Sequence, residues 1–140
     1  MLLSQDVKAA RVANIAAAAQ TDVTSDAVDS RDFDTVAFYA LLGTITATGT
    51  GTMKAQHSDA SGSGFVDVGA SVTYADTDSD KVLILEVSQP VKRYVRVVIE
   101  RDTANAGVNG VLALQGKASA KPVTHDSSVT ASSLVQAPTA

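Results

Sequence analysis

Apolar and polar residues alternate along several stretches of the chain with the period of two that is typical of β-strands. The clearest case is residues 92–102, in which one face carries Val95, Val97 and Ile99 and the opposite face mixes apolar and charged side chains. A charge cluster stands at each end of this stretch. The pattern predicts a long strand with one face in a core.

Five further segments have strand-like patterns, and turn-forming residues separate most of them. In residues 35–49 both faces are apolar, which predicts a central strand covered on both sides. Asp, Ser, Asn and Gly dominate residues 59–64 and 102–107, as expected for turns. Short strands without a helical pattern predict an all-β fold of six to eight strands, a β-sandwich or a barrel. The other four segments are residues 51–58, 65–74, 81–88 and 108–118.

The two ends of the chain differ in character from the middle. Residues 1–22 begin with an Ala-rich segment, for which we favour an extended N-terminal arm or short strand over the helix that Ala propensity alone would suggest. Residues 119–140 are rich in Ser, Thr, Ala and Pro, which predicts a C-terminal tail that is disordered in solution. The sandwich domain is therefore expected to span residues 23–118.

Composition narrows the classes of function. The net charge of −4 argues against direct binding to nucleic acid, and the absence of Cys excludes thiolate catalysis and cysteine-ligated zinc. Charged and polar residues interrupt the N-terminal segment too often for a signal peptide, and no apolar run is long enough to span a membrane. We expect a product made in the cytoplasm, without membrane contact.

Candidate chemistry is sparse. Asp76, Asp78 and Asp80 resemble the start of a calcium-binding loop, but Lys81 and Val87 occupy the positions where an EF-hand needs Gly and an acidic residue. The alternative is a solvated turn, which we favour over a looser calcium site. The two His residues are far apart in the sequence, and no nucleophile motif is present. We therefore expect no enzyme and no cofactor.

The polar face of the strand at residues 92–102 is more informative. Tyr94 and Arg96 lie on it, and both residue types are enriched in protein interfaces. They are candidates for contact with a sister subunit or for fixing the adjacent strand of the same chain. The alternative is a solvent-facing surface with weak cross-strand ion pairs.

Four segments together resemble a family of small virion structural proteins of tailed bacteriophages, the head decoration or cement type. They are AVDSRDFDTVAFYALLG (residues 27–43), KAQHSDASGSGFVDVG (54–69), KRYVRVVIE (92–100) and GVLALQG (110–116). The resemblance covers residues 23–116. It implies a jelly-roll-like β-sandwich on the head surface that binds the major capsid protein and stabilises the assembled head.

The resemblance also implies self-association, with a trimer favoured over a dimer because heads present many three-fold sites. The apolar residues of the N-terminal arm are candidates for the capsid contact, namely Leu2, Leu3, Val7, Val12 and Ile15. Two alternatives remain. One is another virion component, such as a tail, spike-base or head–tail joining protein. The other, less favoured because the chain has no Trp and three Tyr, is a carbohydrate-binding module.

Overall fold

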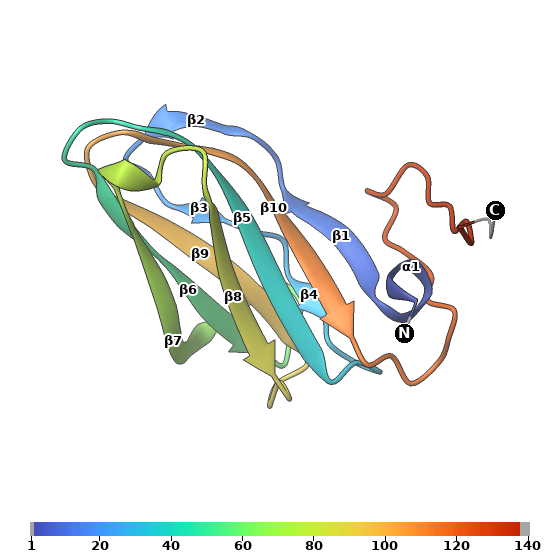
Figure 1. Cartoon of the computed structure of the whole chain (residues 1–140). Coiled ribbons are helices and arrows are strands. Elements are labelled where there is room, and N and C mark those ends of the chain that lie inside the picture. Colours follow the sequence, from blue (N-terminus) through green and yellow to red (C-terminus); the bar gives the residue numbers. More distant parts are fainter. Residues whose placement is uncertain (1, 138–140) are drawn as a thin grey trace.

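Two antiparallel sheets pack against each other and enclose one hydrophobic core (Figure 1). The computed structural model describes residues 2–137. Its elements in chain order are α1 (Leu3–Asp6), β1 (Lys8–Ala13), β2 (Ala16–Ala19), β3 (Val23–Thr24), β4 (Val28–Asp29), β5 (Thr35–Ile45), β6 (Thr50–Ser58), β7 (Val66–Ala75), the 3₁₀ turn η1 (Asp76–Asp78), β8 (Val82–Ser88), β9 (Tyr94–Thr103) and β10 (Ala106–Gly116). Sheet A has the order β1-β10-β5-β8, and sheet B has the order β3-β9-β6-β7.

The strand order is that of a jelly roll. Strands β1 and β2 pair with successive parts of β10, and β3 and β4 pair with successive parts of β9. If each of these two pairs is counted as one position, the eight positions run 1-8-3-6 in sheet A and 2-7-4-5 in sheet B. The predicted all-β, jelly-roll-like sandwich is therefore confirmed.

The core is thin and consists mainly of aliphatic side chains. Period-two alternation in β5, β6, β9 and β10 directs every second side chain between the sheets, where they exclude water. The side chains that are 2% exposed or less include Val36, Phe38, Ala40, Leu42, Met53, Ala55, Val95, Val97, Ile99, Val108, Val111 and Ala113.

The six segments predicted as strands correspond to β5 through β10. The predicted central position of β5 is confirmed, because it lies between β10 and β8. The prediction that both of its faces are covered is wrong. Leu41 on the outer face of β5 remains exposed, as do Ile84 on β8 and Leu112 on β10. The apolar side chains on the outer face of β5 therefore lie at the protein surface and are not covered by a second layer.

The structure also differs from the predicted N-terminal boundary. Residues 8–19 were assigned to an extended arm or short strand outside the sandwich, and they form β1 and β2 at the edge of sheet A. Ala10 and Val12 reach the core from β1, and Val12 is 4% exposed. The ladder to β10 outweighs the helix propensity of Ala here, because tertiary pairing satisfies the backbone and buries alternate side chains. Only the single turn α1 precedes the sheet within the described residues.

The C-terminal segment returns along the outer edge of β1 (Figure 1). The backbone N–H of Val123 donates to the Gln5 carbonyl at 2.8 Å, and that of Asp126 donates to the Ala9 carbonyl at 3.2 Å. We call residues 121–129 the C-terminal strap. The described residues after Gly116 form no helix or strand, and the strap is hydrogen-bonded to the sheet.

Candidate protein-interaction surfaces

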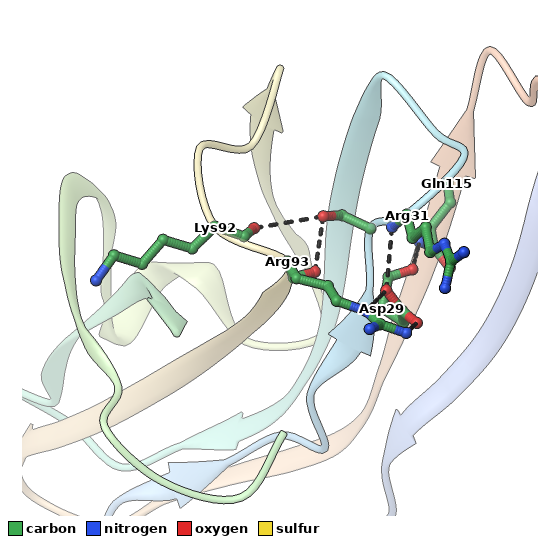
Figure 2. Close-up of polar contacts among 6 residues, drawn as sticks. Asp29, Arg31, Lys92, Arg93 and Gln115 are labelled. Carbon is green, nitrogen blue, oxygen red and sulfur yellow. Dashed lines mark hydrogen bonds and ion pairs between the residues drawn. The ribbon is translucent and has the colours of Figure 1, made fainter. Parts of the chain in front are cut away.

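A carboxylate–guanidinium pair joins two segments that are far apart in the sequence. Asp29 ends β4, and Arg93 immediately precedes β9. Arg93 Nε lies 3.0 Å from Asp29 Oδ1, and Arg93 Nη2 lies 2.8 Å from Oδ2 (Figure 2). This bidentate hydrogen bonding is the main reason that the pKa of the Asp29 carboxyl group lies below its usual value.

Further hydrogen bonds connect this pair to both sheets. Ser30 Oγ donates to the Arg93 carbonyl at 2.7 Å. The buried side chain of Gln115, on β10 of sheet A, donates through Nε2 to the Asp29 carbonyl at 2.7 Å (Figure 2). We call these four residues the Asp29 clamp. Its contacts hold β4, β9 and β10 together, which is a structural role. Three of the four segments that carry the resemblance to virion proteins thus meet in space.

The predicted interface residues on β9 make contacts within the molecule. The Arg96 guanidinium lies over the ring of Phe65, 4.0 Å from its centroid, and Arg96 Nε donates to Gln56 Oε1 at 3.0 Å. Half-buried Tyr94 lies beneath the Arg93 guanidinium at 5.1 Å. The contacts of Arg96 support the interpretation that its side chain fixes neighbouring segments of the same chain, whereas the contact of Tyr94 is with the residue next to it in the sequence.

The rest of the outer face of sheet B is a network of charges. Lys54 Nζ lies 3.0 Å from Glu100 Oε1 and 3.7 Å from Asp67 Oδ1. The hydrogen bond to Glu100 is the main reason that the pKa of Lys54 lies above its usual value. Such exposed pairs contribute little to stability. They give sheet B the polar outer face that is usual for an antiparallel sandwich.

Asp76, Asp78 and Asp80 were a weak candidate for a calcium site. Two of them instead accept hydrogen bonds from backbone N–H groups. Asp76 Oδ2 accepts the N–H of Thr48 at 2.8 Å, and Asp78 Oδ2 accepts the N–H of Ala75 at 2.9 Å. Asp80 follows in a left-handed conformation with φ of 63°. Within residues 2–137, no three acidic, His or Cys side chains lie close enough together to hold a metal ion. The structure therefore does not bring these three carboxylates together.

The five N-terminal candidates separate into two groups. Val12 is in the core, and Val7 is half-buried. Leu2, Leu3 and Ile15 are exposed, with Leu3 at 70% and Ile15 at 71%. Leu2 and Leu3 stand at α1, whereas Ile15 lies in the connection between β1 and β2. We call Leu2 and Leu3 the terminal leucine pair.

A groove of about 430 Å³ lies beside the terminal leucine pair. Its lining comes from α1, β1, β10, the strap and residues 131–133 just beyond it, and its apolar members include Leu3, Val7, Leu114 and Val129. His125 borders this groove and fixes the strap in place. Its Nδ1 accepts the N–H of Ala9 at 3.0 Å, so Nε2 carries the proton and donates to the Ser4 carbonyl at 2.8 Å.

The outer face of sheet A carries an apolar surface, and the sequence interpretation assigned its β5 part to a buried layer. Leu112, Tyr39 and Ile84 are cross-strand neighbours on β10, β5 and β8. Ile84 is 52% exposed, and Leu41 and Val82 form a neighbouring exposed pair. We call this surface the sheet A face; its members are Ala37, Tyr39, Leu41, Val82, Ile84, Leu112 and Leu114.

Arg101 is an important residue that the sequence interpretation missed. It is 4% exposed, and its guanidinium donates to the carbonyls of Thr21, Ala17 and Ala106 at 2.6, 2.7 and 2.7 Å. A fourth bond reaches Thr21 Oγ1 at 3.0 Å. The signal was present in the alternation, because Arg101 falls on the same strand face as Val97 and the other core residues of β9. Arg101 anchors β2 and the segment after it.

Comparison with known proteins shows that the fold of this chain is similar to that of several solved structures. No family model and no curated protein matches the chain. Among solved structures, the PBSX exported protein XepA is 18% identical, with a TM-score of 0.54 over all of this chain. The chain spans 45% of the length of XepA. This similarity shows a shared sandwich fold.

Two other solved structures are similar at lower TM-scores. A disulfide-linked pilus protein of Bacillus endospore appendages is 18% identical over 81% of this chain and 90% of its own, with a TM-score of 0.47. The C-terminal family 22 carbohydrate-binding module of Clostridium thermocellum Xyn10B is 19% identical over 81% and 87%, with a TM-score of 0.38. Within the described part of the chain, no helix is long and apolar enough to cross a membrane.

Proposed function

We propose that this chain is a non-enzymatic structural protein of a bacteriophage particle that decorates the assembled head and binds the major capsid protein. The resemblance to virion proteins supports the class, and three of its segments meet in the Asp29 clamp. The observation that carries the docking role is the exposure of the terminal leucine pair.

The terminal leucine pair is suited to docking because the chain behind it is already ordered. Asp6 Oδ2 accepts the N–H of Leu2 at 2.8 Å and closes the α1 turn. The next strand, β1, is fixed in sheet A by its ladder to β10 and by Val12 in the core. Binding through a preformed segment avoids most of the entropy cost of ordering a free arm. An apolar pocket on the capsid lattice is the complementary partner.

Decoration of this kind requires no chemistry. A protein that binds the assembled lattice and not the dissociated subunits stabilises the shell by linkage. Each copy could bury a standard interface of about 1,600 Å² in total, and many copies would act on one shell. Heads that lack the protein are therefore expected to assemble but to release DNA at a lower temperature.

Occupancy on purified heads tests the docking role. Deleting residues 1–20 would remove β1 and β2 from sheet A, so point substitutions are preferable. We expect a Leu2→Ser, Leu3→Ser double variant to lose most of its occupancy while keeping its fold. Val91→Ser is a matched control, because Val91 is 88% exposed in the connection between β8 and β9. Full occupancy by the double variant, measured by quantitative mass spectrometry, would contradict this docking role.

A further inference from the structure

The edges of the two sheets differ in how far they are protected from pairing with another chain. The strap covers the outer edge of β1, where His125 Nδ1 accepts the N–H of Ala9 and Ser128 Oγ accepts that of the second residue after it at 2.8 Å. Sheet B ends on one side at the short strands β3 and β4. It ends on the other side at β7, where a bulge interrupts the register with β6 and Gly69 has a φ of 95°. Covered, short or bulged edges are the usual ways in which natural sheets avoid pairing with other chains.

Strand β8, at the other edge of sheet A, is seven residues long and has no such cover or bulge within residues 2–137. Hydrogen bonds at both ends of its ladder with β5 show which backbone groups the ladder uses. The N–H of Leu42 donates to the Lys81 carbonyl at 2.9 Å, and that of Gln89 donates to the Asp34 carbonyl at 2.6 Å. In an antiparallel ladder every second residue bonds to the neighbouring strand, and the residues between point their N–H and carbonyl groups to the opposite side. The groups at the free edge of β8 therefore belong to Val82, Ile84, Glu86 and Ser88.

This edge is open to solvent and lies beside an apolar margin of the core. The residues that present their backbone groups there are all exposed, with Val82 at 47% and Ile84 at 52%. Strands β7 and β8 follow each other through η1 on this side of the sandwich (Figure 1). Half-buried side chains pack against the core here without being enclosed, namely Leu83 on β8 and Val68, Ala70 and Val72 on β7. A strand added to β8 would pair its main chain with the edge and place every second side chain on this margin.

The chemistry of the edge defines its partner as an extended segment of polypeptide. N–H and carbonyl groups at strand spacing are complementary to another extended main chain, which gains affinity from main-chain hydrogen bonds and specificity from alternate side chains. On the outer side of the sheet, Val82 and Ile84 favour apolar neighbours, and Glu86 favours a basic one. Thr35 Oγ1 donates to Oε2 of Glu86, and a carboxylate can accept a further bond at its second oxygen.

A second copy of β8 does not meet this requirement. In the antiparallel registers that keep most of the strand paired, Glu86 would lie opposite Val82, Ile84 or a second Glu86. The first two registers give the carboxylate no cation, and the third places like charges opposite each other, which is destabilising. The edge therefore fits a different chain that carries a basic residue at this point.

We propose that the free edge of β8 binds an extended segment of a partner protein by strand addition to sheet A. The segment has apolar residues next to Val82 and Ile84 and a Lys or Arg next to Glu86. Strands β1 and β8 are opposite edges of sheet A, and the terminal leucine pair stands just before β1, so this site is separate from the one proposed for head decoration. Each site has its own measurement, and either can fail alone.

A synthetic peptide of about ten residues tests the site on the full chain. The peptide alternates Val with Thr and has one Lys placed to face Glu86. For a dissociation constant at or below about 100 μM, about 1 mM peptide should slow hydrogen exchange about tenfold or more at the edge amides. Nuclear magnetic resonance measures this at Val82, Ile84, Glu86 and Ser88. The same peptide, methylated on the backbone nitrogens that face β8, is the matched control, because it keeps every side chain and loses the donors; it should give no protection.

Substitutions at Ile84 test the backbone contact from the side of the protein. Ile84→Pro removes an N–H that points away from β5, a position that tolerates Pro in an edge strand, so the sandwich should persist in circular dichroism while the peptide binds at least about tenfold more weakly. Ile84→Thr keeps the N–H and should bind within about threefold of the natural chain. If Ile84→Pro fails to fold, the exchange measurement on the natural chain still decides.

Three results would overturn strand addition at β8. One is an absence of protection at the edge amides with the unmodified peptide, and another is equal protection with the methylated peptide. The third is protection that appears without peptide and rises with the concentration of the chain itself, since the occupant of the edge would then be a second copy.

Discussion

Replacing Arg101 with Met is expected to destabilise the protein by detaching the edge of sheet A. The guanidinium donates four hydrogen bonds to Ala17, Thr21 and Ala106, none of them to a carboxylate. Met has a similar length and apolar volume but no donor, so the substitution removes the bonds with little change in packing.

The expected loss of stability follows from the surroundings of each hydrogen-bond acceptor. Ala106 is fully buried, and loss of a charged donor from its carbonyl costs about 2 kcal/mol. Ala17 and Thr21 are exposed residues, so water can replace part of the other three bonds, at about 0.5–1 kcal/mol each. Relief of the desolvation of a buried guanidinium offsets about 1–2 kcal/mol of this sum. The net loss is about 2–3 kcal/mol.

Urea denaturation measures this loss. For a slope of about 2 kcal/mol per molar urea, the midpoint should fall by about 1–1.5 M. Arg101→Lys should recover less than half of the loss, since a single ammonium cannot reach carbonyls on three separate segments. Arg31→Met, at an exposed position, is the control. A midpoint for Arg101→Met within about 0.2 M of the natural protein would refute the reasoning.

Three further predictions follow from the clamp, the strap and the decoration role. The pKa of Asp29 is lowered in the fold, so its pair contributes stability above the unfolded pKa of about 3.9 and loses it as pH falls through the folded value. Asp29→Asn should therefore lower the free energy of unfolding by about 1 kcal/mol at pH 7. In urea denaturation, the variant should also lose less stability than the natural protein as the pH falls through the pKa of Asp29; an equal loss would contradict this. His125→Ala should free the strap, so that thermolysin cleaves the Ser128–Val129 bond faster while the sandwich persists; unchanged cleavage would show that the strap is held elsewhere. Heads without the protein should release DNA at a lower temperature in a fluorescence melt, and equal melting would contradict stabilisation by linkage.

The sequence predicted the sandwich well because alternation directly reports which side chains face a core. Val95, Val97 and Ile99 illustrate this, and all three are fully buried. Alternation does not distinguish a face covered by the same chain from a face that stays exposed. Leu41 therefore looked buried, although it belongs to the sheet A face.

Two other features depend on contacts that no local pattern encodes. In residues 8–19, Ala favours a helix locally, and pairing with β10 decides the outcome. Asp29 and Arg93 were both part of the resemblance, but 64 positions separate them, so only the folded chain shows that they pair. Burial of Arg101 could have been inferred from its place in the alternation, had its charge not suggested a solvent-facing end.

Copy number on the particle is the most direct test of the proposed function. A cryo-electron map of the purified head, together with quantitative mass spectrometry, would show how many copies are present and where they lie. The decoration role predicts hundreds of copies on the outer surface, with Leu2 and Leu3 against the major capsid protein. A dozen copies or fewer at a vertex or on the tail, or none on the particle, would contradict it.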